Sequence, residues 1–240
     1  MKKLMIAGVV GLCAAVTFGI ESANVVGYQT KTTSSGFNFV APTFKNVSSS
    51  KINIQEISIS GDNITEWVDN IQILDEGGAT VSQYMWLNAF SMGEKAGWYD
   101  LEKNEYASAT LNPGDSILIE TLNEGALITF SGAVADSVIT LTSVCGFNFV
   151  GNATPVSINI QDVKISGDNL TEWVDNIQIL DEGGATVKQY MWLNAFSMGE
   201  KAGWYDLEKN EYVNETIEAG QGFLLETTNA DVTITIPPAL

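Results

Sequence analysis

The feature that most constrains this chain is a segment that occurs twice. Residues 59–106 return at 165–212, shifted by 106 positions, and 46 of the 48 positions are identical. The differing pairs are Ile64/Leu170 and Ser82/Lys188. A repeat of this length and fidelity predicts two tandem copies of one domain.

The repeat units extend beyond the identical segment. We place the first domain at residues 24–132 and the second at 135–240, each about 105 residues long, which is enough for an independent core. The word GFNFV occurs at 36–40 and again at 146–150, an offset of 110. Four residues were therefore gained or lost between this word and the identical segment, as expected for a surface loop.

The local pattern predicts short strands joined by tight turns. Apolar and polar residues alternate with period 2 at 37–39 and 52–54, as in half-buried strands. Turns are indicated by glycine or proline-glycine at 75–78, 112–115 and 122–125. Further strands of the first copy are expected at 25–31, 70–74, 79–87, 116–120 and 126–130, and 137–142 leads the second. The chain should be all-β, each copy being a small β-sandwich or barrel.

Each copy is expected to contain at most one short helix. Asn63 stands three residues before Glu66, and Asn169 three before Glu172, the spacing of a capping box. The predicted helix spans little more than two turns and ends before Asn70.

The first 19 residues have the layout of a secretory signal peptide. Lys2 and Lys3 precede an apolar run at residues 4–18, and small residues follow, with cleavage after Gly19 or a few residues later, after Ala23. An uncleaved N-terminal anchor is the alternative. No later apolar run approaches the ~20 residues that cross a bilayer, so we expect a secreted protein without stable membrane insertion.

Charge and composition exclude several functions. Without the signal peptide the chain has nine lysines against 29 acidic residues, a net charge of −20, so nucleic acid and anionic membranes should repel it. It contains neither arginine nor histidine, which removes a histidine base, an imidazole ligand and an arginine clamp. We therefore expect no enzyme activity, no cofactor and no metal centre.

The acidic residues suggest two weaker alternatives. The segment that begins at Asp100 has oxygen ligands at alternate positions, but Glu105 and Leu111 replace the glycine and glutamate that a calcium loop requires. A solvated turn at 101–104 is the better interpretation. A looser calcium site at Asp75, Glu76 or Asp100 and a carboxylate pair for glycoside hydrolysis stay open.

The mature chain retains one cysteine, Cys145, because Cys13 leaves with the signal peptide. No intramolecular disulfide can form. Its repeat partner is Ser35, so we expect a small buried residue, with an intermolecular disulfide as the alternative.

Aromatic residues allow two interpretations. In the first copy they are Trp67, Tyr84, Trp86, Phe90, Trp98, Tyr99 and Tyr106. Most should pack in the core. Alternatively, Trp98, Tyr99, Trp204 and Tyr205 are exposed and stack on sugar rings, and two identical domains gain avidity.

Several short words give the chain a family resemblance. ANVVGYQTKT, GFNFVAPTF, IQILDEGGAT, QYMWL, GWYDLEK and LNPGDSILIET together resemble a group of secreted β-repeat proteins of the Verrucomicrobia and Lentisphaerae type. The family's PGEG-like last turn departs here to Pro113-Gly114-Asp115 and to Ala219-Gly220-Gln221-Gly222. The resemblance implies export and β architecture, and no established activity comes with it.

Two functional hypotheses follow. The first is an exported structural or cell-surface protein whose partner is itself, assembling through exposed strand edges into fibres or a matrix. The alternative is a carbohydrate-binding module whose partner is a cell-surface polymer. An enzyme is the least favoured.

Overall fold

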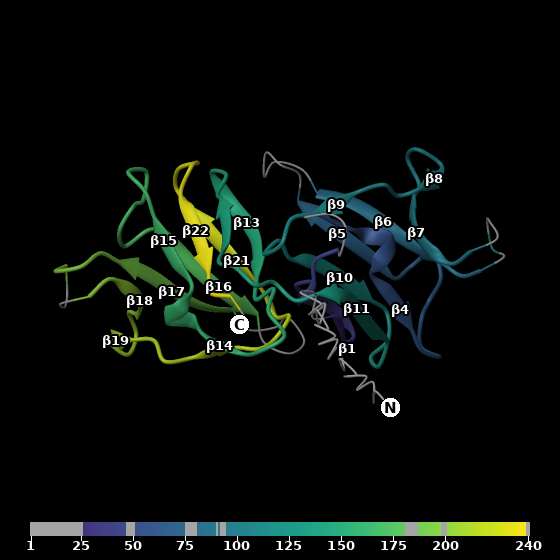
Figure 1. Ribbon diagram of the computed structural model, residues 1–240, viewed down its shortest axis with the longest axis horizontal. Helices are drawn as coiled ribbons and strands as arrows, with labels where there is room; N and C mark the ends of the chain where they lie inside the picture. Colours follow the sequence, from purple (N-terminus) through teal and green to yellow (C-terminus); the bar gives the residue numbers. More distant parts are fainter. Residues whose placement is uncertain are drawn as a thin grey trace, which may run out of the picture.

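The computed structural model describes residues 26–46, 51–74, 81–89, 91, 95–180, 187–197 and 201–238. The described chain is all-β, as predicted, and its strand pairs are antiparallel (Figure 1). The expected signal peptide and the expected turn at 75–78 lie outside the described residues. Within them, no helix has the length and apolar character needed to cross a membrane.

The first half of the chain forms three sheets. A six-stranded sheet has the order β2-β10-β5-β6-β7-β8, a three-stranded sheet has the order β1-β11-β4, and β3 pairs with β9. The strands are β1 (Val26–Thr32), β2 (Gly36–Val40), β3 (Ile52–Asn53), β4 (Ser58–Ser60), β5 (Asn70–Leu74), β6 (Val81–Leu87), β7 (Gly97–Asp100), β8 (Glu105–Tyr106), β9 (Thr110–Leu111), β10 (Ile117–Thr121) and β11 (Leu127–Ala133).

The second half repeats this arrangement strand for strand. Its sheets are β13-β21-β16-β17-β18-β19, β12-β22-β15 and β14-β20. The strands are β12 (Ile139–Thr142), β13 (Gly146–Gly151), β14 (Ile158–Asn159), β15 (Lys164–Ser166), β16 (Asn176–Leu180), β17 (Val187–Leu193), β18 (Gly203–Asp206), β19 (Glu211–Tyr212), β20 (Thr216–Ile217), β21 (Gly222–Thr227) and β22 (Thr233–Ile236). We call residues 26–133 half 1 and residues 135–238 half 2. That each half folds independently stays a prediction.

Each half is a sandwich with its own core. In half 1, Ile71 and Ile119 of the large sheet and Ile128 of the small sheet are fully buried in one cluster. Alternate residues of the same strands face outward, because side chains in a strand point to opposite faces with period 2. The equivalent residues of half 2 form a separate cluster.

One glutamine joins the core tryptophan to the backbone around it. Gln55 lies in the 3₁₀ turn η1 (Ile54–Glu56), and its Nε2 donates to the carbonyls of Trp98, at 2.7 Å, and Ala107, at 2.9 Å. Its Oε1 accepts from Trp98 N at 3.2 Å, while Trp98 Nε1 donates to the Ile57 carbonyl at 2.8 Å. Gln161 of η2 (Ile160–Asp162) makes the same contacts around Trp204 in half 2.

The helix predicted from Asn63 does not form. Residues 65–69 make a turn in which the Asp69 side chain accepts from Thr65 N at 2.9 Å. Glu66 does not reach back to cap the turn and instead accepts from Asn88 N at 3.0 Å. Trp67 has a φ of 65°, which breaks any helical continuation. The short helical turn of each half lies earlier, at η1 and η2.

The two halves contact each other through equivalent residues. An isolated bridge joins Val40 to Gln221, and a second joins Val150 to Asp115, which are the same two positions with the halves exchanged. The hydrogen bond from Ala41 N to Gly220 O, 2.9 Å, likewise has a counterpart from Gly151 N to Gly114 O, 3.0 Å. The halves are therefore related by an approximate twofold axis.

The bridging glutamine yields a stability prediction. Replacing Gln55 with alanine leaves Trp98 N and the Trp98 and Ala107 carbonyls without their side-chain partner in a buried region. We expect a loss of about 2–3 kcal/mol in the free energy of unfolding, measured by urea denaturation. The exposed Gln83→Ala is the control and should stay within about 0.5 kcal/mol of the parent. Equal midpoints for the two variants would refute this role of Gln55.

Candidate functional site

The four aromatic residues proposed to bind glycans do not form an open platform. Trp98 and Trp204 have no exposed surface, because they fill the space between the two sheets of their halves. Tyr99 and Tyr205 point to the opposite face but are only 6% and 5% exposed. The structure therefore corrects this expectation, and assigns the two tryptophans to the core.

The outer face of each large sheet carries a row of side chains that crosses all six strands. The strand register places these residues side by side on one face. In half 1 the row is Phe37, Glu120, Asn70, Met85, Tyr99 and Tyr106. In half 2 it is Phe147, Glu226, Asn176, Met191, Tyr205 and Tyr212. The two rows match residue for residue, and each spans about 24 Å at ordinary strand spacing.

A loop at residues 65–69 lies over the first row and presents Trp67 to solvent. The indole of Trp67 packs edge-on against Tyr99, with ring centroids 6.4 Å apart. Tyr99 in turn packs against Tyr106 at 5.5 Å, and Lys95 Nζ lies 4.9 Å from the Tyr106 ring. Trp67 keeps 41% of its surface exposed. The loop therefore explains why Tyr99 is covered while its neighbour Trp67 is open.

The backbone of this loop is held in a conformation that tryptophan rarely adopts. A bulky residue in the left-handed region is strained by about 1–3 kcal/mol and persists only where its surroundings enforce it. Here Trp67 N donates to Trp86 O at 3.2 Å, and Trp86 N donates to Asp69 O at 2.9 Å. The fully buried Asp69 carboxylate accepts from Thr65 N and from Leu122 N, both at 2.9 Å. The loop is thus a rigid mount for Trp67.

Half 2 carries the same mount. Trp173 has a φ of 67°, is 39% exposed and lies 6.5 Å from Tyr205. Asp175 accepts from Thr171 N and Thr228 N, both at 2.8 Å. In Figure 1, β7 and β8 lie toward one end of the long axis, and β18 and β19 toward the other. We call each exposed tryptophan with its row an aromatic face; face 1 contains Trp67 and face 2 contains Trp173.

Polar groups lie within the aromatic faces. Asn70 Nδ2 donates to Glu120 Oε2 at 3.0 Å, and Gln72 Nε2 donates to Asn70 Oδ1 at 3.0 Å. Phe37, at the other end of the row, is 45% exposed. Each face thus combines apolar rings with amide and carboxylate groups that are already oriented. Nothing local in the sequence distinguishes Trp67 from the other aromatic residues, because its exposure depends on a loop that is held by residues distant in the chain.

The acidic segment at Asp100 is a turn. Asp100 Oδ1 accepts from Glu102 N and Lys103 N, at 3.0 and 3.1 Å, and Oδ2 pairs with Lys103 Nζ at 3.0 Å. At the equivalent Asp206, the hydrogen bond from Lys209 N and the Lys209 ammonium hold the carboxyl pKa below its ordinary value. Over the described residues, no three acidic or cysteine side chains converge as metal ligands would. Asp75 and Glu76 lie outside them.

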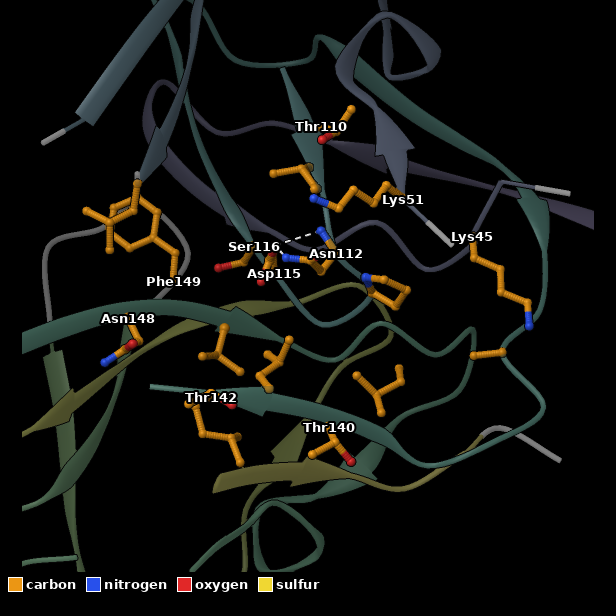
Figure 2. A pocket seen from close by; sticks show the side chains of 18 of the residues that line it. Lys45, Lys51, Thr110, Asn112, Asp115, Ser116, Thr140, Thr142, Asn148 and Phe149 are labelled. Atoms are coloured by element: carbon orange, nitrogen blue, oxygen red, sulfur yellow. Dashed lines mark hydrogen bonds between the residues drawn. The ribbon is translucent and has the colours of Figure 1, made fainter. Parts of the chain in front are cut away.

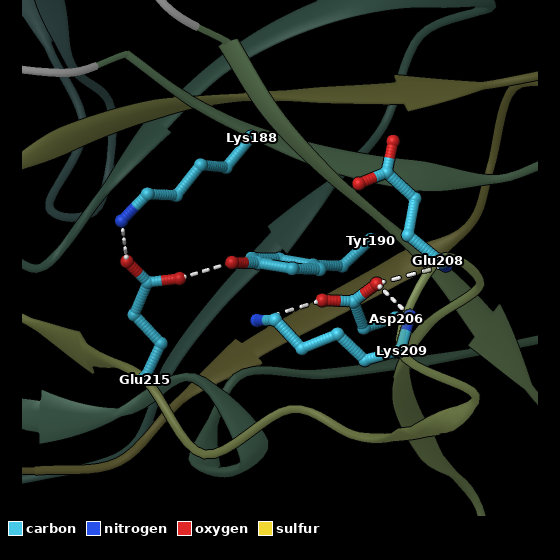
Figure 3. A network of polar contacts seen from close by, with 6 residues as sticks. All are labelled: Lys188, Tyr190, Asp206, Glu208, Lys209 and Glu215. Atoms are coloured by element: carbon cyan, nitrogen blue, oxygen red, sulfur yellow. Dashed lines mark hydrogen bonds and ion pairs between the residues drawn. The ribbon is translucent and has the colours of Figure 1, made fainter.

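Half 2 contains a polar network around one of the two differences within the repeat. Lys188 pairs with Glu215, and the Tyr190 hydroxyl donates to the same carboxylate (Figure 3). Burial and this hydrogen bond raise the pKa of Tyr190 above its ordinary value. In half 1 the corresponding residues are Ser82 and Ala109. Lys188 and Glu215 thus occur together in half 2 and are both replaced in half 1, which indicates that they stabilise the structure as a pair.

A cavity of about 640 Å³ lies where the two halves meet. Figure 2 shows Lys51 and the turn at Asn112 on one side of it and the edge strand β12 on the other. Lys45 pairs with Asp136 at 3.1 Å, and Asp115 accepts from Asn112 N at 2.7 Å. The charged side chains in its lining, Lys45, Lys51 and Asp115, all have partners within the protein.

Cys145 is exposed, which corrects the expectation of a buried residue. Its thiol lies 3.1 Å from the Thr228 carbonyl, as the Ser35 hydroxyl lies 2.9 Å from the Leu122 carbonyl in half 1. Cys145 therefore occupies a surface position at which the side chain contacts a carbonyl, and the apolar character of cysteine does not lead to burial here.

Comparison of the chain with protein-family models, with curated proteins and with solved structures finds no match.

The polar network predicts a coupling between Lys188 and Glu215. Lys188→Ser alone leaves Glu215 without its cation, and Glu215→Ala alone leaves the Tyr190 hydroxyl without its acceptor. Each should destabilise half 2, whereas the double variant restores the pair found in half 1. We expect a coupling of about 0.5–1 kcal/mol in a double-mutant cycle by urea denaturation. Additive effects would show that the two residues act separately.

Lys31 gives a pH prediction. It occupies the position of Leu141 in half 2, and burial lowers the pKa of its ammonium from 10.5 to about 8 although the nearby Glu218 raises it. Between pH 8 and pH 10.5 the unfolded chain therefore binds more protons than the folded chain, and stability should rise with pH. Below pH 8 the cost of the buried charge is fully present.

The test is Lys31→Leu, which copies the residue of half 2. At pH 7 the variant should be more stable than the parent by on the order of 1 kcal/mol, and this difference should shrink toward pH 10.5. Urea midpoints across this range measure it. A difference that stays constant with pH would contradict the lowered pKa.

Proposed function

We propose that this protein is an exported, non-catalytic structural protein of the cell surface that binds carbohydrate polymers through its two aromatic faces. The observation that carries the proposal is the pair of exposed tryptophans, Trp67 and Trp173, each held by an enforced backbone conformation above an identical row. Strain of this kind persists at positions that serve recognition. An indole fixed in place stacks on the apolar face of a sugar ring at little entropic cost.

The polar groups beside each tryptophan complete the arrangement. The buried Asn70 links the partly exposed Glu120 and Gln72 by hydrogen bonds. Glu120 and Gln72 can therefore offer an acceptor and a donor to sugar hydroxyls on face 1. Because the mature chain carries a net charge of −20, anionic polysaccharides are repelled. The expected ligand is therefore a neutral polysaccharide.

The arrangement of the two faces supports a connecting role. Faces toward opposite ends of one molecule can engage two polymer chains, or two segments of one chain, and binding at the second site then gains from effective concentration. A protein that links polymers needs no catalytic group. This agrees with a chain that lacks histidine and arginine.

Self-assembly through strand edges is the second candidate. It is favoured by β1, a seven-residue end strand of its sheet on which Tyr28 is 78% exposed. In half 1 the end strands β4 and β8 have only three and two residues, and short edges limit this kind of pairing. The five-residue end strand β2 contacts half 2 through the bridge between Val40 and Gln221. Edge assembly therefore ranks below the aromatic faces.

The proposal predicts the effect of removing each tryptophan. Trp67→Ala or Trp173→Ala alone should weaken retention on insoluble cellulose, chitin or mannan by about 100-fold, because avidity is lost, and the double variant should abolish retention. Affinity electrophoresis and pull-down measure this. Tyr28→Ala, which removes an exposed ring outside the faces, is the control and should bind like the parent.

Two outcomes would contradict the proposal. If the parent is retained on no polysaccharide, the function is wrong. If the double variant binds like the parent while its circular dichroism is unchanged, the aromatic faces are not the site.

A further inference from the structure

The contact between the halves places several residues against their own counterparts. Phe39 meets Phe149, with ring centroids 5.0 Å apart, and these residues occupy the same position in the two copies of GFNFV. Ser116 and Gly222 also correspond to each other. A Cβ built on Gly222 would lie 2.9 Å from Ser116 Cβ. These pairs therefore mark the approximate twofold axis.

Only one side chain fits at each of these small-residue pairs. The other atoms nearest to a Cβ on Gly222 are Phe39 C and Val40 N, both at 3.0 Å and both in half 1. Similarly, a Cβ on Gly151 would lie 2.5 Å from Ala41 Cβ. Distances below 3.0 Å cannot be accommodated without displacement. If half 1 paired with another half 1, serine would meet serine and alanine would meet alanine, so two Cβ atoms would clash at each position. When half 1 pairs with half 2, a glycine stands opposite each of these residues and only one Cβ is present.

The remaining contacts are reciprocal, as in a symmetric dimer. Val40 and Ala41 of half 1 contact the turn at residues 220–221 of half 2 through a bridge and a backbone hydrogen bond. The same two contacts recur between Val150 and Gly151 of half 2 and the turn at residues 114–115 of half 1. A surface of this kind is self-complementary and can be satisfied within one chain or between chains. Tandem domains of near-identical sequence are prone to such exchange.

We propose that this contact is a pairing surface for a second copy of the chain, in which half 1 of one molecule docks on half 2 of another. The pairs Ala41/Gly151 and Ser116/Gly222 decide which halves pair, because they disfavour the contact of half 1 with half 1. Exchange in one direction builds open chains of molecules, and reciprocal exchange builds closed dimers. This inference is independent of carbohydrate binding.

The experiment uses the full chain with Cys145→Ser, which removes disulfide-linked dimers and copies Ser35. The protein is unfolded in urea, refolded over a series of concentrations and analysed by size exclusion with light scattering. The parent should give dimers and larger species whose fraction rises with concentration during refolding and persists after dilution. An equal mixture of unlabelled and ¹⁵N-labelled chains should give mixed dimers by native mass spectrometry.

Gly222→Ser tests the surface itself, because the three nearest atoms to the new side chain all belong to half 1. Gly222 does not have a positive φ, so its backbone accepts serine. Because the serine weakens the contact within one chain as well as between chains, we expect the oligomers to give way to open monomers with a larger hydrodynamic radius. In the double variant Ser116→Gly with Gly222→Ser, the serine lies on half 2 and the glycine on half 1, so only one side chain is again present between them. This variant should restore the oligomers. Ser116→Gly alone is the matched control and should assemble like the parent.

The restoring variant separates a blocked contact from a misfolded protein, since a general folding defect would not be repaired by Ser116→Gly. A parent that refolds only to monomer at every concentration would overturn the proposal. So would oligomers of Gly222→Ser as abundant as those of the parent, or a double variant that fails to recover them.

Discussion

The buried carboxylate of Asp69, with its counterpart Asp175, is the interaction on which the exposed surface depends. Its two oxygens take backbone hydrogen bonds from Thr65 and Leu122, so it joins the loop before β5 to the turn after β10. A buried carboxylate is tolerated only when it is fully hydrogen-bonded, and this requirement fixes the loop. The strained backbone of Trp67 follows from that anchor, as does the cover that the loop gives to Tyr99.

The strands of this protein could be predicted from sequence, because they follow from local rules. Period-2 alternation located β2, the expected turn at 75–78 located β5, and the expected turns at 112–115 and 122–125 located β10, each to within about a residue. The helix at Asn63 failed because its cap-like spacing was satisfied by other partners: Glu66 binds Asn88, and Thr65 binds Asp69. A local pattern does not reveal partners 22 residues away in the chain.

The site could be predicted only in part. Trp98 and Tyr99 are adjacent in one strand, so they face opposite sides and only one of the two could ever be exposed. The sequence could not show that the inward residue is tryptophan, which depends on the Ile57 carbonyl accepting from its indole N–H and on Gln55 bonding to its backbone N–H and carbonyl. Nor could it show Trp67 as the open ring, because a positive φ at tryptophan is enforced by the tertiary structure alone. Cys145 was misjudged because its position is set by a carbonyl at the surface.

The distribution of differences between the halves fits two separate demands on one duplicated fold. Residues 59–106 and 165–212 are nearly identical, and each supplies one tryptophan mount and four of the six residues of its row. By contrast, only 8 of 26 positions agree between 107–132 and 213–238. The divergent segment supplies Ser116 and Gly222, where the halves meet and cannot both carry a side chain. It also supplies Glu215, which compensates for Lys188. Two surfaces that we propose to bind the same ligand can stay alike, but residues that meet on a twofold axis must differ when there is room for only one side chain.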